Sequence, residues 1–100
     1  MVEVRFADGV WAPVIICDVC STRISDSSQA NAIWSTSDYS GCNGPVLHVH
    51  KDCDDRVAAE PPIAWAPLAD HLFYVCHNAR LTPTKLAEVG RFIKQTAKHF

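Results

Sequence analysis

Apolar and polar residues alternate over the first residues of the chain. Residues 2–6 read Val-Glu-Val-Arg-Phe, and side chains two apart lie on the same face of a strand. Asp8-Gly9 is a typical signal for a two-residue hairpin turn. Pro13 cannot donate a backbone hydrogen bond, which favours an edge strand or a bulge at that position. The pattern predicts a β-hairpin over residues 2–16.

The middle of the chain predicts a second hairpin followed by a helix. β-branched Ile33 and aromatic Trp34 favour a strand, and glycine, asparagine and proline residues mark a long loop behind it. Pro61-Pro62 would end the helix, because proline disrupts a helix interior. The predicted elements are a polar loop over residues 21–29, a strand over 30–35, a loop over 36–45, a returning strand over 46–50 and a helix over 52–60.

Helical spacing replaces alternation in the last third of the chain. Apolar residues recur every three or four positions, as on one face of a helix. Thr82-Pro83 is a typical helix start, with threonine as N-cap and proline as the first helical residue. The two apolar stripes are Leu68, Leu72, Val75 and Ala79, and then Leu86, Val89, Ile93 and Ala97. We predict a helical hairpin with helices over residues 67–80 and 83–99, preceded by a short apolar linker over 63–67.

Composition restricts the class of protein. No apolar run approaches the roughly 18 residues needed to span a bilayer, and the first residues lack the basic start and apolar segment of a signal peptide. We therefore expect a cytoplasmic protein that does not enter the membrane. In a reducing compartment, the five cysteines of this chain are better explained by metal binding than by a disulfide framework.

Cysteine and histidine occur in two pairs at metal-ligand spacing. Cys17-Asp18-Val19-Cys20 lets two thiolates converge from a tight turn, whose backbone N–H groups can hydrogen-bond the sulfur atoms. His50 and Cys53 are three residues apart, so they share a face of a helix. Four soft or borderline ligands suit tetrahedral Zn²⁺. We predict one Zn²⁺ ion, bound by Cys17, Cys20, His50 and Cys53.

Two other residues could replace one of these ligands. His48 and His50 are two apart on the predicted strand and face the same side, so His48 could be a ligand, a group that supports a ligand, or a core histidine. Cys42 lies in the long loop and could reach the site if the loop folds back. The sequence alone leaves both alternatives open.

The order of these motifs resembles that of treble-clef zinc fingers. A Cys-x-x-Cys turn is followed by a hairpin and then by a helix that opens with two more ligands, over residues 14–60. The resemblance implies that Cys17, Cys20, His50 and Cys53 are the zinc ligands. It identifies no particular family, and treble-clef proteins differ widely in function. The predicted fold is α+β: a zinc-binding, treble-clef-like domain over residues 1–60, and a two-helix extension over 61–100 packed on it.

The predicted zinc shell argues against an enzyme. A catalytic zinc site keeps an open coordination position and a carboxylate that acts as general base. Here four ligands close the shell, and no glutamate occurs at the His-x-Glu or His-Glu-x-x-His spacing. We predict a protein that is not an enzyme. A zinc hydrolase that uses His48 and an aspartate is the remaining catalytic alternative.

Charge is distributed unevenly along the chain. Residues 1–79 hold four basic and ten acidic side chains, a net charge of −6, whereas residues 80–100 hold five basic and one acidic, a net charge of +4. A solvated helix face explains this pattern, and so does contact with nucleic acid or an acidic partner. The basic residues of the second segment are Arg80, Lys85, Arg91, Lys94 and Lys98.

The two predicted helices are too small to bury both of their faces, which favours protein association. We predict a protein-interaction or regulatory module that binds a partner protein, or a second copy of itself, through residues 67–100. Leu72, Val75, Leu86, Val89 and Ile93 would form the facing stripes of the hairpin, with Phe92 and Phe100 on its flank. The alternative is a nucleic-acid-binding regulator that uses the basic C-terminal helix.

Overall fold

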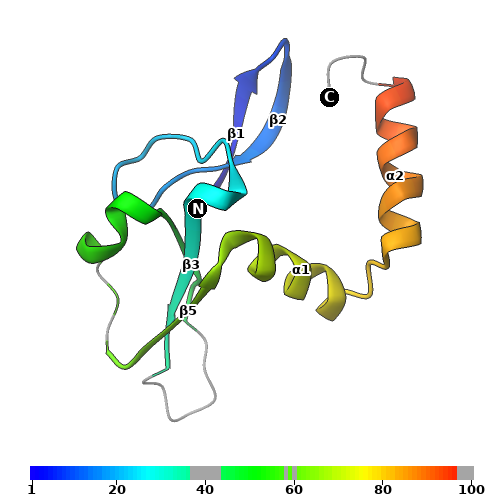
Figure 1. Cartoon of the computed structure of the whole chain (residues 1–100). Helices are drawn as coiled ribbons and strands as arrows, with labels where there is room; N and C mark the ends of the chain where they lie inside the picture. Colours follow the sequence, from blue (N-terminus) through cyan, green and yellow to red (C-terminus); the bar gives the residue numbers. More distant parts are fainter. Residues whose placement is uncertain (37–43, 58, 60, 97–100) are drawn as a thin grey trace.

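The computed structural model describes residues 1–36, 44–57, 59 and 61–96. The chain is a small α+β protein with two antiparallel sheets and two main helices (Figure 1). One sheet is the two-stranded ribbon β1–β2, and the other has the strand order β4-β3-β5. The predicted fold class is confirmed at this level.

The predicted N-terminal hairpin is confirmed. Strand β1 (Val2–Ala7) pairs with β2 (Val10–Ile15), and Val4 stands opposite Pro13. Asp8 and Gly9 have φ angles of 55° and 82°, as a turn that matches the right-handed twist of a hairpin requires at both central residues. Both strands of the ribbon are edge strands, which is why Pro13 is tolerated.

Strand β3 (Ala30–Ser35) is the centre of the second sheet. It pairs with β4 (Leu47–His50) on one side, as predicted, and with β5 (Ile63–Pro67) on the other. The linker predicted over residues 63–67 is therefore wrong. Small Ala64 and Ala66 are half-buried while the larger Ile63 and Trp65 are exposed. The hydrophobic pattern therefore did not indicate a strand here. The division at residue 60 stays a prediction, although β5 joins β3 across it.

Two short 3₁₀ helices connect the strands. The polar loop over residues 21–29 ends in η1 (Ser27–Gln29), which Asp26 caps by accepting a hydrogen bond from the Ser28 N–H at 2.9 Å. The α-helix predicted over residues 52–60 is replaced by η2 (Lys51–Arg56). Val57 already has extended φ and ψ angles, so the helical segment ends there; residues 58 and 60 lie outside the described part.

Both C-terminal helices form. Helix α1 (Leu68–Asn78) packs on β3, β5 and η1. Arg80, with φ of 60°, ends it in a Schellman motif, in which the Leu81 N–H donates to the Cys76 carbonyl at 2.8 Å. Helix α2 (Pro83–Thr96) begins as predicted, because Thr82 Oγ1 accepts a hydrogen bond from the Lys85 N–H at 3.1 Å.

The two helices do not close into the predicted hairpin. Figure 1 shows α2 turning away from α1, and α2 makes no extensive contact with any other described element. Leu72, Val75, Leu86 and Val89 are exposed and do not form the facing stripes predicted for them. Arg80 has a left-handed φ angle and changes the direction of the chain after α1. Helix α2 therefore does not fold back along α1.

The core lies where the two sheets and the start of α1 meet. It contains residues from the Cys-x-x-Cys turn, from β3 and β4, from η2 and from the first turn of α1. Its buried apolar members are Ile16, Cys17, Ile24, Ala30, Ala32, Ile33, Val49, Cys53 and Leu68. Two predicted metal ligands, Cys17 and Cys53, are therefore part of the core itself.

Candidate metal centre

The first pair of predicted ligands lies in a tight turn directly after β2. The Cys17 N–H donates to the Thr22 carbonyl at 2.9 Å, and the Ser21 N–H donates back to the Cys17 carbonyl at 3.0 Å. Ser21 has a left-handed φ of 63°, which reverses the chain. An isolated bridge between Ile16 and Arg23 closes the loop. The backbone thus holds both cysteine side chains on one compact loop.

The second pair comes from the end of β4 and from η2. His50 is the last residue of β4, and Cys53 lies within the 3₁₀ helix that follows. Asp18 joins this pair to the cysteine turn: its backbone N–H donates to the His48 carbonyl at 2.8 Å, and its Oδ2 accepts from the His48 N–H at 2.8 Å. These two bonds place the Cys-x-x-Cys turn beside β4.

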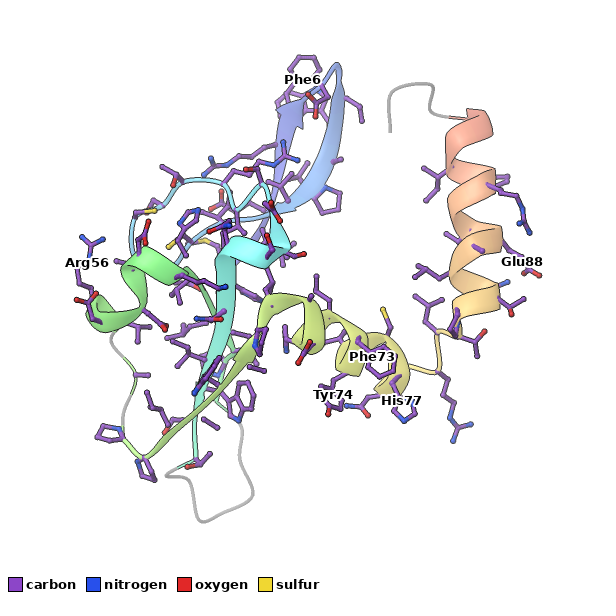
Figure 2. The ribbon with its side chains drawn as sticks, in the orientation of Figure 1. Phe6, Arg56, Phe73, Tyr74, His77 and Glu88 are labelled. Atoms are coloured by element: carbon purple, nitrogen blue, oxygen red, sulfur yellow. The ribbon has the colours of Figure 1, made fainter. Side chains whose placement is uncertain are left out.

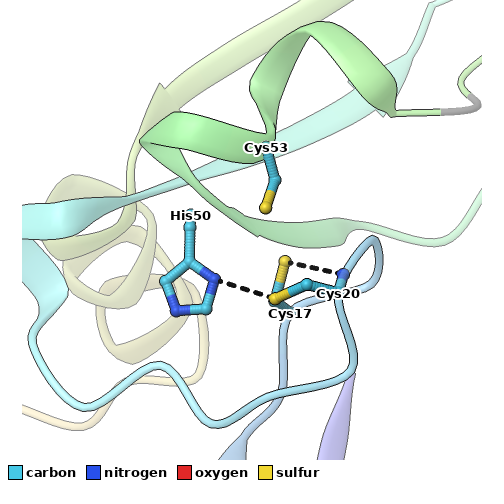
Figure 3. Close-up of side chains that lie close together, drawn as sticks. All are labelled: Cys17, Cys20, His50 and Cys53. Carbon is cyan, nitrogen blue, oxygen red and sulfur yellow. Dashed lines mark hydrogen bonds between the residues drawn. The ribbon is translucent and has the colours of Figure 1, made fainter.

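The fold brings the four predicted ligands together. One donor atom of each of Cys17, Cys20, His50 and Cys53 lies within 4.8 Å of the others (Figure 3). His50 Nδ1 is 3.4 Å from Cys20 Sγ. In the described part of the chain, these residues form the one group of three or more cysteine, histidine or acidic side chains that could hold a metal ion.

Backbone hydrogen bonds favour the thiolate form of Cys17. The N–H groups of Val19 and Cys20 donate to its Sγ at 3.4 and 3.5 Å. Burial by itself raises the pKa of this thiol, but hydrogen bonds from the backbones of Cys20, His50 and Val19 outweigh burial and lower the pKa from 9.0 to about 6. Cys17 is therefore prepared to act as an anionic ligand.

Cys20 is the exposed member of the cluster. The Thr22 hydroxyl lies 2.9 Å from its Sγ, and this hydrogen bond is the main cause that lowers the pKa of the Cys20 thiol. A hydroxyl beside a metal-binding thiolate orients and stabilises it. The sequence analysis did not identify Thr22, although its position two residues after the motif was a signal that could have done so.

The other two ligands respond to the negative charge of the first pair. Burial raises the pKa of the Cys53 thiol, and its hydrogen bonds to the Cys17 and Cys20 sulfurs and the charge of those sulfurs raise it further. Burial lowers the pKa of His50, but the same two thiolates raise it by more. Converging thiolates thus retain a proton, which a bound cation would replace.

This donor set fits a metal ion. Three sulfur atoms and one imidazole nitrogen are the ligands that soft and borderline divalent ions prefer. Their side chains converge from two sides of one small space, as Figure 3 shows. Cys17 and Cys53 are buried, His50 is half-buried and Cys20 is exposed. The cluster can therefore hold one ion at the edge of the core.

The structure describes one of the two alternative ligands, His48, and does not describe the other, Cys42. His48 is not a member of the cluster. Its ring lies 5.6 Å from that of His71, measured between centroids, and burial lowers the pKa of both histidines. Cys42 lies outside the described residues.

Side chains beyond the ligands hold η2 in place, and the sequence analysis did not identify them. Asn31, buried on β3, donates from Nδ2 to Asp54 Oδ2 at 3.1 Å. Arg56 Nη2 donates to Cys53 Sγ at 3.4 Å. The partners are 23 residues apart in the first pair, so no local motif indicated the contact between Asn31 and Asp54.

The described basic residues among those predicted to contact a partner lie on or beside α2. Arg80, Lys85 and Arg91 are exposed, and Lys85 Nζ lies 3.9 Å from Glu88 Oε2. Lys94 belongs to α2, and Lys98 lies outside the described residues. None of the described helices is long and apolar enough to cross a membrane.

Comparison with known proteins adds no further assignment. No family model matches the chain, and neither a curated protein nor a solved structure matches it.

Proposed function

We propose that the protein is a small, non-catalytic zinc-binding module that mediates protein association. The observation that carries the metal-binding part is the convergence of Cys17, Cys20, His50 and Cys53 within 4.8 Å. A set of three cysteines and one histidine is a common ligand set of structural zinc sites. Zn²⁺ would offset most of the negative charge of the three thiolates and cross-link the two halves of the core.

The number of donors supports a structural role for the metal. Four protein ligands fill the tetrahedral shell of Zn²⁺ and leave no position for water or substrate. Asp18 Oδ2 accepts a hydrogen bond from the His48 N–H, and Asp54 Oδ2 accepts one from Asn31 Nδ2. Each carboxylate thus makes a hydrogen bond through one oxygen that holds the centre together, which supports our proposal that the protein is not an enzyme.

The arrangement of elements supports a treble-clef-like architecture. The Cys-x-x-Cys turn is followed by the hairpin β3–β4 and then by a helical segment that carries Cys53, with His50 directly before it. The departure is that this segment is the short 3₁₀ helix η2 and not an α-helix. Two candidate ligands still come from the turn and two from the hairpin–helix junction, which is the order of ligands that the resemblance to treble-clef zinc fingers implies.

The association role rests on apolar surface. Phe73, Tyr74 and Val75 on α1 and Leu86 on α2 are exposed, and exposed apolar patches are typical of protein interfaces. A cytoplasmic location belongs to the proposal, because free thiols persist in a reducing compartment. The partner protein or second copy would bind through residues 67–100.

Metal stoichiometry tests the proposal. Native mass spectrometry of the protein purified under reducing conditions should show one Zn²⁺ per chain. Cys20→Ser should lose it, because serine cannot replace a thiolate toward zinc. His48→Ala is the matched control and should retain it, since His48 lies outside the cluster. A parent that binds no zinc, or a Cys20→Ser variant that binds it as tightly, would contradict the metal site.

A further inference from the structure

The ribbon β1–β2 carries an apolar face that the described part of the chain leaves exposed. Val4 pairs with Pro13 and Phe6 with Trp11, and residues two apart on a strand share a face. Phe6 is 61% exposed and Trp11 is 71% exposed, with their ring centroids 5.4 Å apart. Figure 2 shows Phe6 at the far tip of the ribbon. We call these two rings the aromatic tip.

A second apolar surface is the groove between α1 and α2. It has a volume of about 480 Å³, and Figure 2 shows Phe73 on its α1 side, near the junction of the helices. Phe73 is 62% exposed and Leu86, on the α2 side, is 50% exposed. The apolar residues that line the groove are chiefly Leu72, Phe73, Cys76, Leu81, Pro83 and Leu86. An apolar recess between two helices accepts large side chains of a partner.

The two surfaces carry charges of opposite sign. Asp8 occupies the turn of the ribbon, next to the aromatic tip. Arg80 lines the groove, and Lys85 lies on α2 beside Leu86. Within the described ranges, no ion pair engages Asp8 or Arg80. An acidic tip and a basic rim are complementary, and such complementarity determines which surfaces meet.

We propose that the ribbon of one copy of this chain docks in the groove of a second copy, and that a two-fold axis repeats the contact. The aromatic tip fills the groove against Phe73 and Leu86, and Asp8 faces Arg80. A contact between two different patches closes when the axis exchanges the copies. This docking rests on the association role proposed above and specifies that the partner is a second copy of the chain.

A second copy suits these surfaces better than other occupants. Within the described part of one chain, the ribbon makes no extensive contact with α1 or α2. Figure 1 shows the β1–β2 ribbon and helix α2 as separate projections of the molecule. Stable interfaces bury about 800 Å² on each partner, and one aromatic side chain contributes about 150–250 Å² when fully buried. Two reciprocal contacts approach this size more closely than one contact with a separate peptide.

Complementation between two variants of the full chain tests the proposal. Trp11→Lys removes the aromatic tip and keeps the groove, whereas Leu86→Lys disrupts the groove and keeps the ribbon. Each variant alone should dimerise about 100-fold or more weakly than the parent, because central apolar anchors dominate interface affinity. An equal mixture should associate more tightly than either variant alone but more weakly than the parent, since the ribbon of Leu86→Lys fits the groove of Trp11→Lys in one of the two contacts, whereas the other contact combines both substitutions. Sedimentation equilibrium measures all three samples.

Controls separate this proposal from the metal site. Trp65→Lys changes a tryptophan on β5 that is 62% exposed and lies outside both surfaces, and it should leave the dimer unchanged. A parent that stays monomeric at high concentration overturns the proposal, and so does a mixture that associates no more tightly than either variant alone. Zinc content is measured in every sample: a dimer without zinc would contradict only the metal site, and a monomer with zinc only the docking.

Discussion

The residues around the Cys17–Cys20–His50–Cys53 cluster and the residues of helix α2 differ in how far their apolar side chains are buried. Around the cluster, Ile16 and Val49 are fully buried, and Leu68 brings the start of α1 into the same core. On α2, Leu86 and Val89 are exposed, and the helix makes no extensive contact with the rest of the described chain. Among the described residues, the apolar side chains around the cluster are thus packed in a core, whereas Leu86 and Val89 of α2 stay exposed.

This contrast indicates where the stability of the fold resides. A small domain buries a smaller fraction of its surface than a large one, and a metal cross-link compensates for a small core. Since Cys17 and Cys53 are core residues, a metal held by them would link the core directly. Helix α2 has its own N-cap at Thr82 and makes no extensive contact with the other described elements.

Loss of the metal should have the largest effect on the region around the cluster. Structural zinc contributes about 10–16 kcal/mol of apparent binding free energy in small zinc domains, and the net stability of a domain is about 5–15 kcal/mol. We expect chelation of the metal, Cys17→Ser or Cys53→Ser to unfold most of residues 14–60. Loss of protection in amide hydrogen exchange measures this effect.

His48→Ala is the control for that experiment. The His48 side chain is not in the cluster, and its backbone bonds to Asp18 do not depend on the imidazole. Exchange protection over residues 14–60 should persist in this variant. If the two cysteine variants were folded and as heat-stable as the parent, the metal would not be the link that holds this region together.

Two leucines one helical turn apart on α1 differ in burial. Leu68 is 1% exposed and Leu72 is 38% exposed. Leu68→Ala should lower the free energy of unfolding by about 2–5 kcal/mol, because it leaves a cavity in the core. Leu72→Ala should lower it by about 1 kcal/mol or less. Urea denaturation at low protein concentration measures both, and equal losses would show that α1 is buried along its whole length.

Local signals account for the parts of the fold that were predicted correctly. Asp8-Gly9 adopts the two positive φ angles of its turn, and Thr82 caps α2. The Cys17–Cys20 turn likewise depends on backbone bonds within six residues. In each case the residues that determine the geometry are neighbours in sequence, so a short motif contains the necessary information.

Long-range packing accounts for the parts that were missed. In β5, exposed Ile63 and Trp65 alternate with half-buried alanines, so hydrophobicity gave no indication that this segment is a strand or which of its faces is covered. The apolar stripes of α1 and α2 were recognised, but a stripe does not specify the surface that covers it. The same limit applies to the metal centre: ligand types and spacing indicated the cluster, whereas the contact between Asn31 and Asp54 requires the folded sheet.

The smallest expected effect concerns the cap of α2. Thr82 Oγ1 accepts a hydrogen bond from the Lys85 N–H at 3.1 Å, and loss of an N-cap costs about 1 kcal/mol. Because α2 has no extensive contacts with the core, Thr82→Ala should loosen this helix alone. We expect amide exchange in its first turn to accelerate about fivefold, with the urea midpoint of the core unchanged.

Thr82→Ser distinguishes capping from other effects of the substitution. Serine retains the hydroxyl that accepts the Lys85 N–H, so exchange in the first turn of α2 should stay close to that of the parent. A shift of the core midpoint in Thr82→Ala, but not in Thr82→Ser, would mean that the helix and the core unfold together. The apolar side of α2 would then be bound within its own chain, and the surface that we assign to a second copy would not be available to it.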